Sequence, residues 1–454
     1  MNGYKIIDQR VDNQWRNTLI NELKNRQVLY VALSSMTGNQ IKGTLEAARI
    51  VKKVSKEILI VMGGVHVSFL PTQTLNHPLI DVVVIGEGEI TLQELTKSLD
   101  GDKRLDQIDG IGYKTKDNEI KINKSRSLID ISNAMNIPYN LVDIKNYFVD
   151  LYGGRKTLSL QTGRGCPHRC TYCYNLIYNK KKWRSISSED IIRKIKTLKG
   201  YGAQTIDLVD DNFFTNIKRV EELVIMLEKE DLKMKFMTNC RIDYLVRMDI
   251  SFLKRLNKVG FNEVFLGIES GSQRILDFIK KDITVEQIIE ANKKLKESKI
   301  KAVYAFMAGF PDEKISDVQK TINMMINLKK DNPICSVTSI KAYMPFPGTE
   351  LFDIATKKGF KHPKSLEEWS IFNFNYTEYG FNSKKMTKLI EKLSYLTYFL
   401  DKETMVQNFG GNFLLNILIR IYCDLVLLRC KLGFYHLSPE LYIMRKLREK
   451  LFGD

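Results

Sequence analysis

Short apolar runs alternate with segments of helical periodicity along the first part of the chain. In order, these segments are Ile6-Ile7, 13–25, 28–33, 43–54, 58–62, 82–85 and 91–99. The runs at 28–33, 58–62 and 82–85 are almost continuously apolar, as is typical of parallel strands buried on both faces. Their alternation with amphipathic helices predicts an α/β domain with a doubly wound parallel sheet. A period-two pattern from Ile111 to Ile122 around Lys116-Asp117-Asn118 predicts a hairpin.

The same alternation returns in the middle of the chain. The expected strands are 158–161, 205–209, 235–238, 263–267, 302–306 and 337–343, with helices such as 188–199, 218–228 and 285–297 between them. Six βα units predict an open, partial (β/α)6 barrel. Functional residues of such barrels lie at the carboxyl ends of the strands.

These patterns divide the chain into four parts. We expect an N-terminal sheet domain at 1–124, a linker at 125–155, a barrel domain at 156–380 and a helical region at 381–454. Within the last part, 413–432 is strongly apolar but is interrupted by Asn416, Arg420, Asp424 and Arg429. A membrane-spanning helix rarely keeps four such groups. A helix packed on the barrel is the favoured interpretation, and peripheral contact with a membrane surface is the alternative.

Composition narrows the classes of partner. The 454 residues include 70 Lys and Arg against 53 Asp and Glu, which gives a net charge of +17. The lysines are dispersed, as in 293–296, and such runs are usually solvated helix faces. No zinc-finger, RRM or helix-turn-helix signature is present, so nucleic acid is disfavoured as a partner. With no signal peptide pattern at the N-terminus and seven cysteines, we expect a reducing, cytoplasmic location.

Three cysteines lie within eight residues in the segment Gly163-Arg164-Gly165-Cys166-Pro167-His168-Arg169-Cys170-Thr171-Tyr172-Cys173. Their spacing is C-x3-C-x2-C. Thiolates suit Fe–S clusters or zinc, but a closed zinc site needs four ligands. The remaining cysteines are scattered and form no second pair. Three thiolates can hold three irons of a [4Fe–4S] cluster and leave the fourth iron open for reaction.

The segment resembles the cluster loop of the radical S-adenosylmethionine (SAM) superfamily, including the aromatic Tyr172 before the third cysteine. The resemblance implies that Cys166, Cys170 and Cys173 bind a [4Fe–4S] cluster and that SAM chelates the open iron. One electron, from a donor such as a flavodoxin or ferredoxin, then cleaves SAM to methionine and a 5′-deoxyadenosyl radical.

Motifs at the later strand ends extend this resemblance. Asp210-Asp211 follows the second barrel strand, Gly267-Ile268-Glu269-Ser270-Gly271 is similar to the family's "GIESG", and Gly309-Phe310-Pro311 is similar to its "G-x-P" turn. The resemblance implies a SAM site formed by Tyr172, Asp210, Asp211, Asn239, Arg241, Glu269, Ser270, Gly309 and Tyr343. A structural ion pair remains an equal alternative for Arg241.

Three glycine-bearing loops follow strands of the N-terminal sheet: 34–38, 63–66 and 86–89. Placed before the cysteine motif, they resemble the cobalamin-binding domain of B12-dependent radical SAM enzymes. The implied cobalamin residues are Ser35, Thr37, Gly38, Gly63, Gly64, His66, Gly86, Glu87 and Gly88. No D-x-H-x-x-G motif is present, so a histidine ligand to cobalt is not indicated. The sheet also departs from the family, because it starts late and lacks the expected first βα unit.

The resemblance implies an enzyme that methylates an unactivated carbon of a small-molecule or lipid-like substrate. Ring closure or rearrangement without methyl transfer is the alternative within the same architecture. A methylthiotransferase is disfavoured, because no cysteine precedes Cys166. A non-catalytic zinc-binding interaction protein is the alternative from another class. We assign no catalytic side chain from the sequence.

Overall fold

The computed structural model describes residues 3–101, 104–134, 136–151, 154–372 and 378–435. The chain divides into two compact units. The first unit comprises 1–147, 177–179 and 361–373, and the second comprises 148–176, 180–360 and 374–454. The domain boundaries expected at 124, 155 and 380 stay predictions.

The first unit is built on a five-stranded sheet with the order β1-β2-β3-β4-β5. Its strands are β1 (Tyr30–Ser34), β2 (Leu59–Gly63), β3 (Val82–Val84), β4 (Ile111–Lys114) and β5 (Ile120–Ile122). The first three are parallel, and β4 and β5 form the predicted hairpin antiparallel to β3. The predicted strand at Ile6-Ile7 is wrong: residues 3–8 are not in a strand, and Ile6 is 49% exposed. A run of two apolar residues forms a strand only where a partner strand offers hydrogen bonds, and β1 pairs only with β2 among the described strands.

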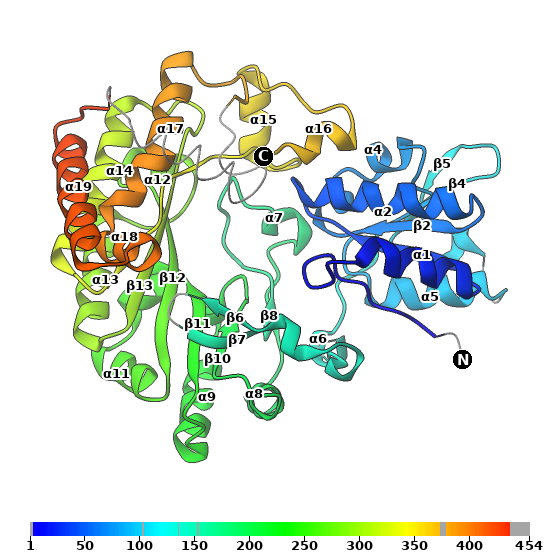
Figure 1. The fold of residues 1–454 in the computed structure, drawn as a ribbon, viewed down its shortest axis with the longest axis horizontal. Helices are drawn as coiled ribbons and strands as arrows, with labels where there is room; N and C mark the ends of the chain where they lie inside the picture. The colour runs from blue at the N-terminus through cyan, green and yellow to red at the C-terminus, as the bar shows by residue number, and fades with distance from the viewer. Residues whose placement is uncertain (1–2, 102–103, 135, 152–153, 373–377, 436–454) are drawn as a thin grey trace. The chain divides into compact units, whose positions relative to one another are not determined.

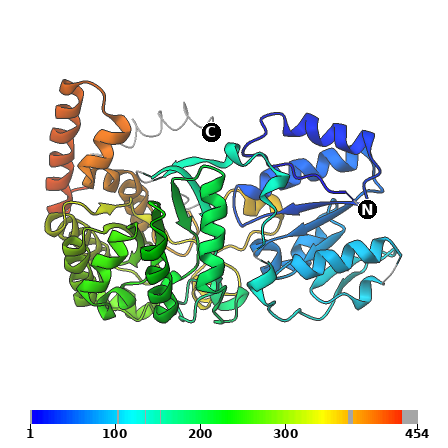
Figure 2. The ribbon, with the colours of Figure 1, turned by 90° about the horizontal axis from the view of Figure 1, so that it is seen from below.

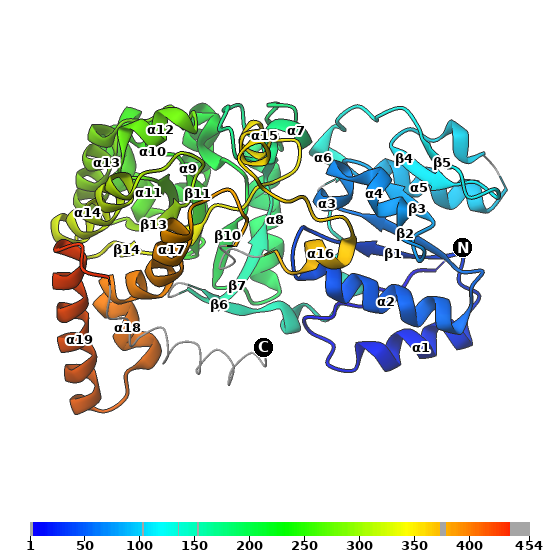
Figure 3. The same ribbon diagram turned by 90° about the horizontal axis from the view of Figure 1, so that it is seen from above.

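Helices lie on both sides of this sheet (Figure 3). They are α1 (Trp15–Asn25), α2 (Gln40–Val54), α3 (Val65–Phe69), α4 (Pro71–Asn76), α5 (Glu89–Leu99), α6 (Ile131–Ala134) and α16 (Leu366–Ser370), with 3-10 turns η1 (Leu105–Gln107), η2 (Tyr139–Leu141) and η3 (Ile144–Tyr147). Leu95 of α5 belongs to a buried cluster with Val61 and Val84. Because side chains alternate along a strand, Val83 points to the other face, where it lies near Leu75 of α4. This double covering explains the apolar runs of β2 and β3. The expectation of burial on both faces is wrong for β1, where Ala32 and Ser34 are exposed.

The second unit contains a curled sheet with the order β14-β13-β12-β11-β10-β7-β6, to which β15 adds beside β13 (Figures 1 and 2). Its strands are β6 (Val149–Leu151), β7 (Gly154–Leu160), β10 (Thr205–Leu208), β11 (Lys235–Cys240), β12 (Phe261–Glu269), β13 (Lys301–Ala308), β14 (Ser336–Val337) and β15 (Lys341–Ala342); β8 (Gly163–Arg164) and β9 (Arg184–Ser185) form a separate ribbon. All neighbours are parallel except β6 with β7 and β8 with β9. The predicted partial barrel is confirmed.

Helices lie between successive strands of the second unit from β8 to β14, and four more α-helices follow β15 among its described residues. They are α7 (Asn175–Tyr178), α8 (Ser188–Gly200), α9 (Ile217–Glu230), α10 (Ile242–Arg247), α11 (Ile250–Lys258), α12 (Gln273–Phe278), α13 (Val285–Ser298), α14 (Ile315–Asp331), α15 (Glu350–Lys357), α17 (Lys384–Leu396), α18 (Lys402–Phe409) and α19 (Phe413–Lys431), with η4 (Phe213–Thr215) and η5 (Thr397–Leu400). The predicted strand at 337–343 is two short strands instead. Between them the Ile340 N–H donates to Thr397 Oγ1 at 2.9 Å, so this backbone group does not continue the sheet.

Helix α19 has two contrasting faces. Cys423, Val426 and Cys430 are fully buried, which agrees with packing on the second unit. The opposite face exposes apolar side chains: Leu414, Leu418, Ile421, Leu425, Leu428 and Leu432 are each more than half exposed. Among the described residues, no helix combines the length and the apolar character needed to cross a bilayer.

Candidate functional site

The cysteine loop leaves the ribbon β8 and lies at the carboxyl ends of the barrel strands. Cys170 is 7% exposed, while Cys166 and Cys173 are half-buried, and all three are free thiols. Burial raises the pKa of Cys173 to about 12 and also raises the pKa of Cys166. A buried thiolate therefore needs positive charge beside it, which a metal centre or a cation provides.

Backbone and side-chain contacts hold this loop in place. Asp211 accepts hydrogen bonds from the Gly165 N–H at 2.8 Å and from the Tyr174 hydroxyl at 2.9 Å, one on each side of the cysteines. The Thr171 N–H donates to the carbonyl of Ile279 at 3.0 Å. The structure thus places Asp211 as a support of the cluster loop.

Arg241 stands next to the thiols. Its Nη1 lies 3.4 Å from Cys170 Sγ, its Nε donates to Asp243 at 2.9 Å, and its Nη2 donates to the Lys281 carbonyl at 2.6 Å. The guanidinium is buried, and its contacts are those of a structural ion pair that also places positive charge beside the Cys170 sulfur.

Glu269 occupies an unusual backbone position at the end of β12. The register between β12 and β13 shifts between Gly267 and Glu269, and Glu269 has a φ of 68°. Bulges re-aim side chains, and left-handed backbone in a residue other than glycine costs roughly 1–3 kcal/mol. This strain directs a buried carboxylate to the strand ends, where the cysteine loop also lies.

A second cation completes the group. Lys281 Nζ donates to Glu269 Oε1 at 2.9 Å and to the Tyr172 hydroxyl at 3.2 Å, and that hydroxyl donates to Glu269 Oε1 at 3.0 Å. Lys281 is 6% exposed. No sequence motif marks Lys281, and dispersed lysines are usually solvated, so its role becomes visible only in the fold.

Asp210 and Asn239 lie close by, but their side chains face protein groups. The Asp210 carboxylate accepts from the Thr162 N–H and hydroxyl at 2.5 and 2.6 Å and lies 3.7 Å from Arg219. Asn239 donates to the Asp210 carbonyl at 3.1 Å. These contacts tie the end of β7 to the end of β10.

Asn212 follows Asp210 and Asp211 at the end of β10, and no role is predicted for it from the sequence. It is 1% exposed, and neither atom of its side-chain amide has a hydrogen-bond partner among the described residues. Buried polar groups without a partner are rare and often mark a ligand or water. A composition rule could not have found it, since its burial without a partner becomes visible only in the fold.

The other predicted SAM residues are buried around this group. The Ser270 hydroxyl pairs with Thr321 Oγ1 at 3.1 Å, and the Gly309 carbonyl accepts from Asn382 at 2.9 Å. Tyr343 stacks on Phe310, with ring centroids 5.4 Å apart. Gly309 has a φ of 87°, so the turn requires its glycine. The role of each of these residues toward SAM stays a prediction.

The three loops of the first unit meet at the carboxyl edge of its sheet. The Ser35 N–H donates to the Gly63 carbonyl at 3.0 Å, which joins the first two loops. At Gly64, φ is 105° and a Cβ would lie 2.3 Å from the Ser35 carbonyl oxygen; at Gly38, φ is 108° and a Cβ would lie 2.4 Å from that of Phe372. These two glycines are required for the loops themselves. Gly63 has ordinary space at its Cβ position.

His66 is fully buried between these loops. Its Nδ1 lies 3.0 Å from Thr37 Oγ1, and its ring contacts Trp369 of α16 with centroids 5.5 Å apart. Its Nε2 has no hydrogen-bond partner among the described residues. Burial lowers the pKa of His66 to about 4, so the ring is neutral near pH 7. This agrees with a loop hydrogen-bonding role.

The third loop differs, because it leaves room. Gly86 has a φ of 78°, and nothing lies within 4 Å of a Cβ placed there. Its N–H donates to Ser68 Oγ at 2.8 Å, and its carbonyl accepts from Tyr178 at 3.0 Å. Glu87 accepts from the Ile129 N–H at 3.0 Å, and Gly88 begins α5. An open backbone turn and an orphaned imidazole nitrogen fit a large ligand at this edge.

Comparisons with known proteins match two separate parts of the chain to two families. Residues 160–325 match the radical SAM superfamily and residues 2–96 match the B12 binding domain. An uncharacterized methyltransferase from Pyrococcus horikoshii is 29% identical over 407 residues, which cover 89% of this chain and 86% of that protein. An anaerobic magnesium-protoporphyrin IX monomethyl ester cyclase from Cereibacter sphaeroides is 27% identical over 77% of this chain and 56% of its own length.

A solved structure agrees in fold. The cobalamin-dependent SAM radical enzyme OxsB, with aqua-cobalamin and SAM bound, matches with a TM-score of 0.71 and 19% identity over 96% of this chain and 69% of that chain. The three free thiols, the cation beside them and the open glycine loop fit the groups that these domains bind. The cofactors are therefore a [4Fe–4S] cluster, SAM and cobalamin, and the zinc-binding alternative is set aside. The chain is a cobalamin-dependent radical SAM enzyme.

Proposed function

We propose that this enzyme transfers a methyl group to an unactivated carbon of a small molecule. The observation that carries the proposal is the similarity to a protein named a methyltransferase, which spans nearly the whole of both chains. When bound, the cluster and SAM supply a radical that removes hydrogen from the substrate, and cobalamin supplies the methyl group.

The side chains described above divide this work. Cys166, Cys170 and Cys173 hold the cluster, and Arg241 lowers the cost of burying their charge. Glu269 accepts hydrogen bonds from the ribose hydroxyls of SAM, and Lys281 orients that carboxylate. A donor of the flavodoxin or ferredoxin class supplies the electron.

The test is anaerobic reconstitution with iron, sulfide and hydroxocobalamin, followed by reduction in the presence of SAM. Radical cleavage releases 5′-deoxyadenosine, and methyl transfer from SAM releases S-adenosylhomocysteine. Formation of both supports the proposal. 5′-Deoxyadenosine without S-adenosylhomocysteine would favour cyclisation or rearrangement, which the similarity to the cyclase supports as the second candidate. Formation of neither would contradict both.

Peripheral membrane contact stays a proposal for α19 alone. It is supported by the exposed leucines, including Leu418 and Leu425. Flotation with phosphatidylglycerol vesicles tests it: the wild-type protein should float with the vesicles, and a variant with Leu418→Glu and Leu425→Glu should not. Equal flotation of both proteins would contradict it.

A further inference from the structure

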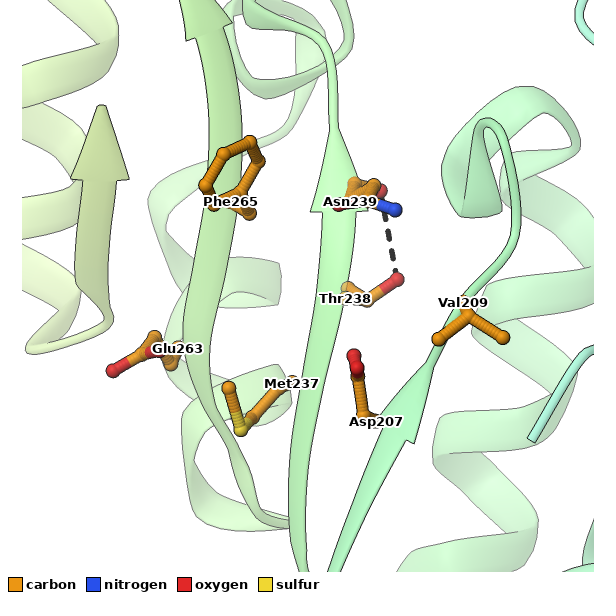
Figure 4. A pocket seen from close by; sticks show the side chains of 7 residues that line it. All are labelled: Asp207, Val209, Met237, Thr238, Asn239, Glu263 and Phe265. Atoms are coloured by element: carbon orange, nitrogen blue, oxygen red, sulfur yellow. Dashed lines mark hydrogen bonds between the residues drawn. The ribbon is translucent and has the colours of Figure 1, made fainter. Parts of the chain in front are cut away.

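A cavity of about 210 Å³ lies against the inner face of the barrel sheet (Figure 4). Its lining residues come from β10, the residue after it, β11 and β12: Asp207, Val209, Met237, Thr238, Asn239, Glu263 and Phe265. Asn239 is a predicted SAM residue, and the other six lining residues carry no role from the sequence. Its upper part reaches Asn239, whose amide contacts the Asp210 carbonyl at the strand ends.

The strand register explains why polar groups gather here. Ser159, Asp207, Met237, Glu263 and Lys301 are successive partners across five parallel strands. Partners in register point to the same face of a sheet. The alternate residues, such as Ile206 and Leu208, are fully buried on the other face. The sequence therefore places one layer with two carboxylates and one ammonium group on the inner face.

The charges of this layer do not balance. Lys301 Nζ lies 3.2 Å from Glu263 Oε2, so these two groups compensate each other. Figure 4 shows the Glu263 carboxylate directed away from Asp207. Among the described residues, no hydrogen bond or ion pair engages the Asp207 carboxylate. Its partial burial raises its pKa, with desolvation as the sole cause. A half-buried carboxylate without a counter-charge is costly unless something compensates it.

The remainder of the lining is mostly apolar. Met237 is the register partner of Asp207, and Phe265 pairs with Asn239 one layer above. Val209 follows β10 beside them. This arrangement puts one anionic oxygen pair among a thioether, an isopropyl group and an aromatic ring. Ammonium groups that carry short alkyl chains satisfy both parts, through charge on Asp207 and apolar or cation–π contact with the ring.

We propose that this cavity binds the protonated amine end of the substrate, with Asp207 as its counter-ion. The inference rests on the proposed function, since it names the substrate class of the same barrel. Ligand pockets usually measure about 300–1,000 Å³, so a 210 Å³ cavity holds an aminoalkyl group rather than a whole large molecule. The amine anchors one end of the substrate and leaves the rest to extend toward the cluster loop.

The experiment measures binding and does not depend on turnover. Equilibrium dialysis of the reconstituted holoenzyme with SAM uses n-butylamine as the probe at pH 8. Butyrate and n-butanol are the comparison ligands, because they keep a four-carbon chain but carry a negative charge and no charge, respectively. The wild-type protein should bind the amine at least tenfold more tightly than either. Asp207→Asn should lose that preference. Asp231→Asn, which changes an exposed carboxylate outside the cavity, should keep it.

Two outcomes would overturn the inference: equal binding of butylamine and butanol by the wild-type protein, or unchanged amine binding by Asp207→Asn. Circular dichroism and cluster absorbance of each variant show whether it is folded. The wild-type protein is assayed in parallel for 5′-deoxyadenosine. Absence of 5′-deoxyadenosine counts against the proposed function. A lack of amine preference in the wild-type protein counts only against this inference.

Discussion

The carboxyl edges of the two sheets hold their cofactor residues in opposite ways. At the barrel edge, buried side chains make the contacts: three thiols, the Glu269 carboxylate and the Arg241 and Lys281 cations. At the N-terminal edge, the backbone shapes the loops, with Gly38, Gly64 and Gly86 all at positive φ.

This difference predicts opposite sensitivities. A site made of charged side chains is damaged when a side chain is removed, because its partner is left buried without compensation. A site made of backbone is damaged when a side chain is added, because the space and the φ angle suit only glycine. Substitutions of each kind therefore test the comparison directly.

Removal of the three thiols should have the largest effect. The triple variant Cys166→Ala, Cys170→Ala and Cys173→Ala should bind no [4Fe–4S] cluster after anaerobic reconstitution, because the loop then contains no ligand. The measurement is the iron and sulfide content together with the absorbance near 400 nm. Cys240→Ala is the matched control, since Cys240 is buried at the end of β11 and should not contribute. A full cluster signal in the triple variant would contradict the assignment.

Loss of one carboxylate charge at the barrel edge should come next. Glu269→Gln should weaken SAM binding by about 10- to 100-fold, since hydrogen bonds to charged groups contribute about 1.5–3 kcal/mol. Cluster content should not change. Equilibrium dialysis with labelled SAM measures the affinity. Glu263→Gln on the same strand is the control and should bind SAM normally, because its partner Lys301 lies below the strand ends. Normal affinity in Glu269→Gln would place SAM elsewhere.

Addition of a side chain should have a smaller effect, confined to cobalamin. Gly86→Trp adds an indole where nothing lies within 4 Å of a Cβ, so it should fold but reduce bound cobalt by severalfold. Gly101→Trp is matched, because Gly101 also has a positive φ of 102° and open space, but it follows α5 at the far end from the loop. Cobalt content per protein is measured after growth with hydroxocobalamin. Gly64 is unsuitable for this test, since its Cβ would strike the Ser35 carbonyl whether or not cobalamin is bound.

Equal cobalt in the two tryptophan variants would show that the third loop does not contact cobalamin. Loss of cobalt in both would indicate a general effect of left-handed backbone strain. Only selective loss in Gly86→Trp supports the assignment.

Much of the fold followed from hydrophobic periodicity, and the failures have physical causes. The runs at β2 and β3 are buried on both faces, so their apolar character alone located them; the run at β1 was also located, although none of its strand residues is fully buried. Ile6-Ile7 is equally apolar but has no partner strand among the described residues. Local composition does not reveal whether a partner strand is present. The final barrel strand divides at Ile340, because a hydrogen bond to Thr397 replaces one to the sheet, and that contact is 57 residues away in sequence.

Within the site, motifs identified positions but not partners. Glu269 was located by its motif, whereas Lys281 became visible only when the fold brought it to the same carboxylate. The carboxylate of Asp210 contacts Thr162 and Arg219, both distant in sequence, and its role toward SAM stays a prediction. Side-chain direction depends on such long-range contacts, which spacing rules do not contain.

The turn at Gly309 combines both features, because a glycine shapes its backbone and a side chain binds its N–H groups. Substitution of that side chain should have the smallest effect of the changes considered. Glu313 Oε2 accepts hydrogen bonds from the N–H groups of Gly309 and Phe310, and the residue is 8% exposed. Burial raises the pKa of Glu313 from its ordinary 4.5 to about 8. The protonated carboxyl is therefore favoured in the folded state. Its contribution to stability is complete below about pH 4.5 and is lost as the pH rises through about 8.

Between pH 6 and 8.5 the wild-type free energy of unfolding should fall by roughly 1–3 kcal/mol because of this group. Glu313→Gln cannot ionise but can still accept both hydrogen bonds, so its urea midpoint should change less over the same interval. If wild type and Glu313→Gln lose stability in parallel, the carboxyl is ionised in the folded state, and the turn at Gly309 is held by charge.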